Sequence, residues 1–303
     1  MRHGRWRFLA GALVPALALH AVFVLSPYAQ AFYLSLTDWT GVAGEAHFVG
    51  AGNYARLGGD SLFLDALRNN AVMLVVVPLV TIGIGLFLAS MMHLGGSDGR
   101  RGIAGSGAYQ IVYFFPQLLS LVVIAVLWGF VYNPNTGLLN GALRSVGLDG
   151  LTRSWLASPS LALIAVMAVL VWSSVGFYVV LFSAAIDSIP RELFEAALLD
   201  GAGGWATFRT VTLPLVRESV QVAFVYLGIA ALDAFAVVQV MTVGPGGPDG
   251  ATEVIGLSLY RNAFQYGKFG YASAMGVALF FATLTLAVLA LRSGGRKERL
   301  ELA

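Results

Sequence analysis

The chemically most informative residues of the chain fall in one polar stretch, residues 188–214, which lies between two long apolar segments. Within it, the carboxylates Glu195 and Asp200 lie close to the small residues Ala196, Ala197 and Gly201. The small residues would let the surface of another protein approach closely, and the carboxylates would offer charges to it. Recognition of a partner is the chemistry that these residue types indicate.

Local signals predict a short helix, a glycine turn and a second helical piece within this stretch. Pro190 suits the first turn of a helix, because its missing N–H is not needed there. Asp200-Gly201 should end that helix, and Pro214 falls in or near the first turn of the next apolar segment. The stretch is too short and too polar to span a membrane. The alternative to docking is an interfacial helix that caps the bundle.

The composition excludes several classes of function. The 303 residues include no cysteine, which excludes disulfides, a thiolate metal site and a cysteine nucleophile. The four histidines are scattered without ligand spacing, so no metal site is expected. Neither lysine, Lys268 or Lys297, lies in a Gly-x-x-x-x-Gly-Lys-Ser/Thr frame, so the chain has no ATP-binding loop of that kind. A net charge of +2 is too small to indicate a nucleic-acid partner.

The hydrophobic content indicates a membrane protein. Only 11% of the residues are charged and 58% are hydrophobic, whereas a soluble domain carries roughly 25% charged residues. A spanning helix needs about 20 mostly apolar residues. Six segments reach that length, at residues 8–36, 67–93, 107–132, 159–186, 212–242 and 270–292. We therefore predict an all-α polytopic membrane protein with six transmembrane helices.

The distribution of arginine and lysine predicts that both termini are cytoplasmic. With that orientation the cytoplasmic segments hold twice as many of these residues as the outer loops. The expected organisation is a cytoplasmic N-terminus (1–7), a first transmembrane helix (8–36), a transmembrane domain (67–292) that includes the loop 188–214, and a cytoplasmic tail (293–303). A cleaved signal peptide is the alternative for the first segment, but its apolar stretch is too long for one.

The polar stretch 188–214 resembles the EAA loop of ABC importer permeases. The matching pattern is Glu195-Ala196-Ala197, three residues, Gly201, nine residues, Val211, one residue and Leu213-Pro214. The family form has isoleucine where this chain has Val211. The extension Asp200-Gly201-Ala202 is similar to the carbohydrate-uptake branch in particular.

Further matches follow in order along nearly the whole chain. They comprise Phe48 to Tyr54, which is similar to an FVGLxNY segment, Trp172 with Gly176-Phe177, Ile189-Pro190, Gly244 to Pro248, which resembles a TxGGP turn with an inserted proline, Tyr260-Arg261 with Ala263-Phe264, and Gly270 to Ala274. The resemblance implies the fold of a type I ABC importer transmembrane domain in the cell membrane.

The resemblance also implies partners and roles. The residues that would couple to a separate ATPase are Glu195, Ala196, Ala197, Asp200, Gly201, Leu213 and Pro214. A second homologous permease, a cytoplasmic ATPase dimer that uses ATP with Mg²⁺, and an extracytoplasmic solute-binding protein would complete the importer. The chain itself would be a transport subunit for a sugar or sugar-like solute, with no cofactor and no enzymatic activity of its own.

Polar residues inside the apolar segments are the candidates for the solute pathway, because charge within a membrane is costly. Asp233 is the clearest case, and with Gln239 it could hydrogen-bond sugar hydroxyls along a hydrated cavity. Alternatively, Asp233 lies near the outer end of its segment and reaches headgroup water. Phe177, Tyr178 and Phe235 could stack on sugar rings or could serve packing alone.

Two other classes of membrane protein fit the sequence less well. A secondary transporter driven by an ion gradient would want paired ionisable residues at the bilayer midplane and inverted repeats. The sequence has one lone Asp233 and no detectable repeat. A membrane-embedded enzyme would need a cluster such as His-Glu-x-x-His, which the sequence lacks.

Overall fold

The computed structural model describes residues 11–294 apart from 12, 42, 43, 95–111, 243 and 245. The predicted N-terminus (1–7), most of the predicted tail and the first residues of the third predicted span lie outside the described residues. So does the proline that the sequence inserts into the turn at Gly244 to Pro248. Helices dominate the described part, which also contains one isolated antiparallel bridge between Thr37 and Phe48.

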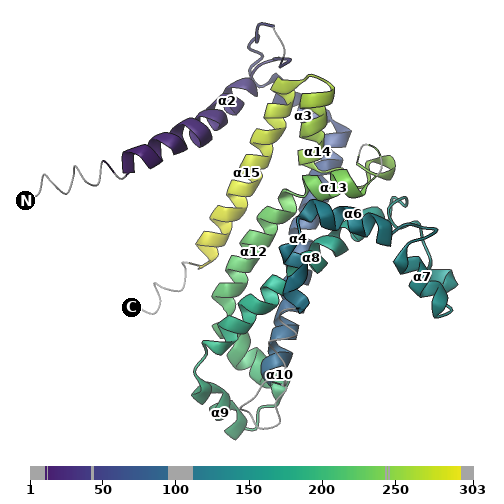
Figure 1. Ribbon diagram of the computed structural model, residues 1–303. Coiled ribbons are helices and arrows are strands. Elements are labelled where there is room, and N and C mark those ends of the chain that lie inside the picture. The colour runs from purple at the N-terminus through teal and green to yellow at the C-terminus, as the bar shows by residue number, and fades with distance from the viewer. Residues whose placement is uncertain are drawn as a thin grey trace, which may run out of the picture. The chain divides into compact units, whose positions relative to one another are not determined.

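Figure 1 shows the order of the described helical elements along the chain. The α-helices are α2 (Ser26–Leu34), α3 (Gly52–Gly59), α4 (Ser61–Leu94), α6 (Leu121–Val131), α7 (Leu138–Ser145), α8 (Ala162–Asp187), α9 (Arg191–Leu199), α10 (Gly204–Thr207), α11 (Leu213–Leu215), α12 (Arg217–Leu232), α13 (Phe235–Met241), α14 (Ile255–Tyr260) and α15 (Phe269–Gly294). Short 3₁₀ turns are η2 (Phe115–Leu118), η3 (Asp149–Leu151) and η5 (Pro248–Gly250), and π-helical turns are η1 (Ala21–Leu25), η4 (Phe208–Thr212) and η6 (Arg261–Gln265).

Four helical stretches of the described chain are long and apolar enough to cross a membrane. They are Leu13–Leu34, Ser61–His93, Ala162–Asp187 and Phe269–Leu289. Two further pairs pass the same test only when their halves are taken together, although each pair is sharply bent. The predicted number of six spans is reached when each bent pair counts as one span.

The third predicted span (107–132) is not one straight helix. Its described part consists of Val112–Leu118 and Leu121–Val131, which are bent by 111° relative to each other. The cause is local, because Leu119 and Ser120 between them have extended backbone, with ψ of 144° and 136°. Helical hydrogen bonding cannot pass through two extended residues.

The fifth predicted span (212–242) is also interrupted. Gly204–Leu215 and Arg217–Leu232 are bent by 70°, and α12 ends at Leu232. Asp233 and Ala234 then have ψ of 36° and 9°, so α13 starts again as a separate helix. Asp233 therefore lies in a break between two helices rather than within a continuous span.

The chain packs as two compact units, one made of Met1–Leu64 and Ser258–Phe281 and the other of Asp65–Leu257 and Ala282–Ala303. In the first unit, residues of the Phe48 to Tyr54 motif hold the end of α2. The amide nitrogen of Asn53 donates to the carbonyl oxygens of Ser35 and Thr37, both at 2.8 Å. The hydroxyl groups of Tyr54 and Ser35 lie 2.7 Å apart. Fixing the chain after α2 is the structural role of this motif.

The start of α15 is fitted closely to the same unit. A side chain at Gly270 would overlap the carbonyl group of Thr37. The next residue, Tyr271, donates from its hydroxyl to Oδ2 of Asp60 at 2.6 Å, and its ring lies 4.9 Å from the guanidinium carbon of Arg56. The match at Gly270-Tyr271 thus coincides with a close backbone approach and a partly buried hydrogen bond.

The second unit contains two apolar clusters. The first gathers α4, α6, α8 and α13 around Met73, Ile124, Val166, Val169 and Val237. The second joins α4, α8 and α12 around Leu86, Phe182, Ile186, Val216 and Leu227. The second cluster lies directly behind loop 188–214, because α8 leads into that loop and α12 leads out of it.

One glycine fixes how the third predicted span meets α8. A Cβ atom built on Gly176 would overlap the carbonyl group of Tyr113 and lie 2.9 Å from the backbone nitrogen of Phe114. Backbone approaches α8 so closely at this point that no side chain fits between. The match at Gly176-Phe177 therefore has a packing reason.

Candidate functional site

The docking candidate α9 is a short helix that ends in a glycine turn, as predicted. It begins directly after Pro190 and ends at Leu199. Gly201 has a φ of +75°. Its N–H donates to the carbonyl of Leu198 at 3.0 Å, and the N–H of Ala202 donates to the carbonyl of Ala197 at 2.9 Å. These two bonds form a Schellman motif, which satisfies the last carbonyl groups of the helix.

One side of α9 is anchored and the other is open. Phe194 is half-buried and packs, together with Val211, against the second apolar cluster. Ala197 is also half-buried, whereas Leu198, which the spacing i, i+3, i+4 from Phe194 places on the same face of the helix, is 61% exposed. Leu199 is 89% exposed. The exposed residues also include Glu195, Ala196, Asp200 and Gly201.

The other two predicted coupling residues lie elsewhere in the loop. Leu213 and Pro214 are exposed and belong to α11. They lie between the π-helical turn η4 and the 70° bend that precedes α12. In the same part of the loop the rings of Trp205 and Phe208 stack with centroids 5.4 Å apart. Leu213 and Pro214 thus lie where the loop leads back into α12, and they are not part of α9.

An interaction that we did not predict from the sequence joins the ends of α4 and α8, beside loop 188–214. The Nε2 atom of His93 lies 3.0 Å from Oδ1 of Asp187, and its Nδ1 atom lies 2.7 Å from the carbonyl oxygen of Ala89. His93 lies at the end of α4 and Asp187 is the last residue of α8. Their position at the ends of two apolar segments is the signal that could have paired them.

Two adjacent asparagines near the start of α4 hold the break in the fifth predicted span. Asn70 is buried; its Oδ1 accepts the N–H of Ile255 at 2.8 Å and its amide donates to the carbonyl of Leu232 at 3.4 Å. Asn69 donates to the carbonyls of Ala251 and Glu253 at 3.2 and 2.9 Å. Asn70 therefore satisfies one carbonyl that the break at Asp233 releases.

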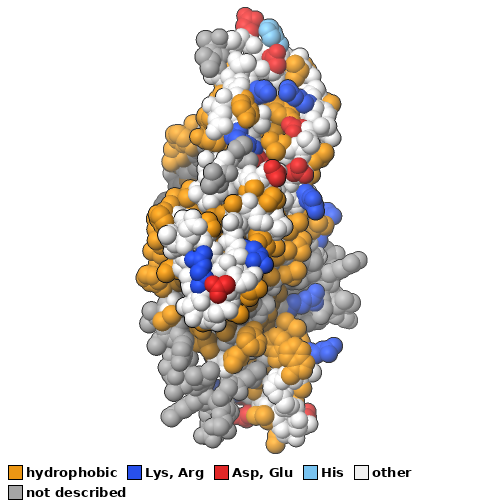
Figure 2. Space-filling model, turned by 90° about the vertical axis from the view of Figure 1, so that its right-hand side faces the viewer, with side chains coloured by type: hydrophobic (Ala, Val, Ile, Leu, Met, Phe, Trp, Pro, Cys, Tyr) orange, Lys and Arg blue, Asp and Glu red, His pale blue; other side chains and the backbone are white. Residues whose placement is uncertain are grey.

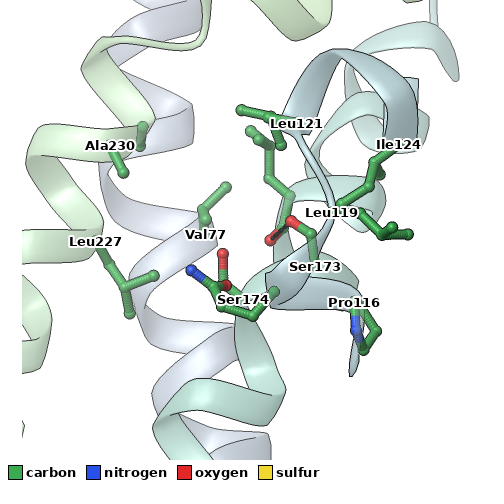
Figure 3. Close-up of a pocket in the computed structure, with 12 residues that line it drawn as sticks. Val77, Pro116, Leu119, Leu121, Ile124, Ser173, Ser174, Leu227 and Ala230 are labelled. Carbon is green, nitrogen blue, oxygen red and sulfur yellow. Dashed lines mark hydrogen bonds between the residues drawn. The ribbon is translucent and has the colours of Figure 1, made fainter. Parts of the chain in front are cut away.

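A cavity of about 210 Å³ lies among the helices of the second unit. Its walls come from α4, the bent third span, α8 and α12. The lining residues are Val77, Pro116, Gln117, Leu119, Leu121, Ile124, Leu170, Ser173, Ser174, Leu227, Ala230 and Ala231. Leu227 and Ala230 lie on one side and Pro116 and Leu119 on the other, as Figure 3 shows. We call this cavity the intramembrane pocket.

The polar groups of the intramembrane pocket are uncharged. They are the amide of Gln117 and the hydroxyls of Ser173 and Ser174. The hydroxyl of Ser173 donates to the carbonyl of Leu170 at 2.9 Å, which leaves its oxygen as an acceptor. None of the described residues that line the pocket carries a charge. The pocket can therefore offer hydrogen bonds and apolar contacts, but no ion pair.

The five residues that we predicted along the solute pathway do not line this pocket. Asp233 and Gln239 are exposed, and Phe177 is 41% exposed beside Phe114. Tyr178 is buried in the second apolar cluster, and Phe235 packs against the first. The structure thus favours packing for Tyr178 and Phe235.

Comparison with known proteins identifies the family of this chain. Residues 65–295 match the profile of the binding-protein-dependent transport system inner membrane component. The chain belongs to this family. It is a permease subunit of an ABC importer, as its EAA loop indicated, and therefore a transport component rather than an enzyme. Nothing in the comparisons supports an ion-driven secondary transporter.

Several relatives share most of the length of the permease. The diacetylchitobiose uptake system permease protein NgcF of Streptomyces coelicolor is 48% identical over 96% of this chain and 84% of its own. The probable ABC transporter permease protein YurN of Bacillus subtilis is 38% identical, with coverage of 92% and 93%. The multiple sugar-binding transport system permease protein MsmF of Streptococcus mutans is 32% identical, with coverage of 97% and 96%.

A solved structure shows the fold. The permease resembles a chain in the crystal structure of a bacterial ABC transporter that imports the acidic polysaccharide alginate, with a TM-score of 0.80 at 24% identity over 97% of this chain and 96% of that one. At this identity the similarity concerns the fold alone. It confirms the predicted all-α fold of a type I importer transmembrane domain.

Proposed function

We propose that the permease forms one half of the membrane pathway of an ATP-driven sugar importer, with α9 docked in a cleft of a separate ATPase subunit. The observation that carries this proposal is the asymmetry of α9. Its inner side is anchored by Phe194, its end is closed by the turn at Gly201, and its outer side exposes small and acidic residues with Leu199. Leu198 and Leu199 expose 61% and 89% of their side chains next to small residues, which gives a partner protein an apolar contact and room to approach the helix.

The packing behind α9 suggests how movement would be transmitted. When ATP closes the two ATPase subunits, their clefts would carry the two docked helices inward. Phe194 packs against a cluster whose residues come from α4, α8 and α12, so a push on α9 would be passed to that shared cluster. Rigid movement of the two permeases would then open the central cavity outward, and ATP hydrolysis would return the inward-facing state.

The proposal requires three partners. A second homologous permease would complete the pathway, an ATPase dimer would use ATP with Mg²⁺ on the cytoplasmic side, and a solute-binding protein would deliver the solute outside. The absence of an ATP-binding loop in the sequence supports a separate ATPase. A solved alginate transporter of the same fold was crystallised with its substrate-bound periplasmic protein. In this arrangement both termini are cytoplasmic.

Purification of the tagged permease in mild detergent tests these partners. We expect a second six-span permease and an ATPase with a phosphate-binding loop to co-purify and to be identified by mass. The Leu199→Asp variant should lose the ATPase and keep the second permease, because the substitution charges the docking surface and leaves the membrane helices unchanged. Recovery of the permease alone, with transport in liposomes that lack ATP, would contradict the proposal.

For the solute, we propose a neutral sugar. The relatives whose names state a substrate include a diacetylchitobiose permease and a lactose permease, the latter 30% identical. The intramembrane pocket offers an amide, two hydroxyls and apolar walls, which suit sugar hydroxyls or an acetamido group. A phosphorylated polyol would need a cation, and none of the described lining residues is basic.

The solute could pass through the intramembrane pocket or along the exposed face near Asp233. One amide side chain in each place allows the two paths to be tested separately. Gln117 lines the pocket, whereas Gln239 is exposed beside the break at Asp233. We expect Gln117→Leu to lower ATP-dependent uptake of a neutral disaccharide in vesicles about three- to tenfold, the loss expected for one hydrogen bond. Stimulation of the ATPase by the loaded binding protein should persist. If Gln239→Leu has this effect and Gln117→Leu does not, the solute follows the exposed face.

A further inference from the structure

The connection between α6 and α8, residues 133–158, is a folded element rather than a loose loop. Asn140, 1% exposed, lies at its centre. Its amide donates to the carbonyls of Pro134 and Arg153 at 3.1 and 2.9 Å, and its oxygen accepts from the backbone of Arg153 and from the indole N–H of Trp155 at 3.3 and 2.8 Å. All hydrogen-bonding positions of this amide are used. We call this element the outer module.

Two arginines of the outer module are held in fixed positions by backbone carbonyl oxygens. Arg144 donates to the carbonyls of Pro134 and Asn135 at 3.0 and 3.1 Å. Arg153 donates to those of Gly150 and Thr152 at 2.7 and 2.8 Å. Among the described residues neither guanidinium forms an ion pair. Each retains N–H groups for an anion, because a guanidinium has five donors.

The module also exposes aliphatic side chains. Leu138 is 74% exposed, Val146 68%, Leu151 53% and Leu148 47%. Its inner side is covered, since Leu139, Trp155 and Leu156 pack against the first apolar cluster. Four uncovered aliphatic residues beside two arginines form the pattern of an interfacial element that inserts apolar side chains below the lipid headgroups.

The position of the module in the chain favours the bilayer as the occupant of this surface. It starts two residues after α6 and ends four residues before α8, and both helices are apolar along their length. Aromatic rings gather at this junction: Trp128 and Tyr132 lie 5.2 Å apart, Trp128 and Trp172 5.3 Å, and Tyr132 and Trp155 6.3 Å. Tryptophan and tyrosine are enriched where the membrane meets water.

We propose that the outer module is a binding site for anionic phospholipid headgroups, with Arg144 and Arg153 on the phosphates and the four aliphatic residues in the acyl boundary. Asp149 is the one acidic residue of the segment, so its net charge is positive. The side of the molecule that carries α7 in Figure 1 faces the viewer in Figure 2, where Lys and Arg side chains border hydrophobic ones. This site is additional to the docking helix and to the solute pathway.

Because this chain has no cysteine, a single introduced cysteine can be labelled on the purified permease before the importer is assembled, and it then reports the insertion. Leu148→Cys would carry an environment-sensitive fluorophore in the assembled importer, in nanodiscs that contain phosphatidylglycerol. We expect quenching by shallow spin-labelled lipids and protection from aqueous iodide. Leu199→Cys on α9 is the matched control, and in the permease pair without its ATPase we expect it to be quenched by iodide. Protection of position 148 only on addition of the binding protein, or only by the second permease without lipid quenching, would overturn the proposal.

The role of the two arginines can be tested by measuring which phospholipids remain bound to the importer. In native mass spectrometry of the importer, Arg144→Gln and Arg153→Gln should each lower the affinity for phosphatidylglycerol about fivefold, the effect of one basic residue at an anionic surface. Affinity for phosphatidylcholine should not change. Arg68→Gln, an exposed arginine outside the module, is the control. Unchanged phosphatidylglycerol binding in the double variant would overturn the proposed headgroup contacts.

Discussion

Replacing Gly201 with leucine should reduce ATP-dependent uptake at least tenfold while the permease still inserts and pairs. Gly201 has a φ of +75°, and a Cβ atom built there meets nothing within 4 Å. The substitution therefore causes no clash inside the permease, and its local strain is about 1–2 kcal/mol. The new side chain would project from the turn that closes the docking helix. Uptake and solute-stimulated ATP hydrolysis, measured together in proteoliposomes, would reveal the uncoupling.

Two matched variants separate bulk from backbone strain at this turn. Gly201→Ala introduces the strain of a left-handed residue almost without bulk, so most of the uptake should remain. Gly203→Leu introduces the same bulk two residues later, where φ is −73° and a Cβ again meets nothing within 4 Å. If Gly201→Leu transports normally, the turn takes no part in coupling. If Gly201→Ala fails as badly as Gly201→Leu, strain rather than contact with the ATPase explains the loss.

The docking helix could be predicted from the sequence because its signals are local. Pro190 before the helix and Asp200-Gly201 at its end act within a few residues, and the structure has the helix boundaries where those residues indicate. Which side of α9 is anchored was harder to predict. Phe194 packs against a cluster that includes residues of the distant helix α4, and the short apolar spacing did not distinguish it from the exposed Leu198.

The breaks in the third and fifth spans could not be predicted from hydropathy. Leu119 and Ala234 are ordinary residues of an apolar run, yet the chain leaves the helical conformation beside both. At the second break the reason is tertiary, because Asn70 on α4 bonds the released carbonyl of Leu232. Hydropathy measures the length of an apolar run, and it contains no information about a hydrogen-bonding partner 162 residues away.

The intramembrane pocket could not be predicted from the sequence, for a related reason. We searched for residues that are costly in a membrane, and Asp233 and Gln239 were the ones that stood out. The pocket uses Ser173 and Ser174, whose hydroxyls can bond to their own helix and therefore cost little within an apolar segment. The bent third span closes one wall through Gln117, so the pocket exists only because that span is not straight.

Substitution of Gly176 by alanine should prevent normal assembly of the permease. The added methyl group would overlap the backbone carbonyl of Tyr113 and crowd the nitrogen of Phe114. A backbone cannot relieve the overlap by changing a rotamer, so the cost should reach or exceed the 1–3 kcal/mol typical of overpacking. That is a large share of the roughly 5–15 kcal/mol that holds a protein folded. Yield from membranes and the thermal midpoint in detergent would both fall.

The same substitution at Gly83 provides the control. Gly83 also lies within a long apolar helix of the second unit, but a Cβ there meets nothing within 4 Å. Gly83→Ala should be neutral or stabilising by about 0.5–1 kcal/mol, since alanine loses less backbone entropy in a helix. A normal midpoint for Gly176→Ala would show that the third span can move away from α8. Because Pro116 and Gln117 follow Tyr113 into the wall of the intramembrane pocket, that movement would reshape the pocket, and uptake should then fall although the fold survives.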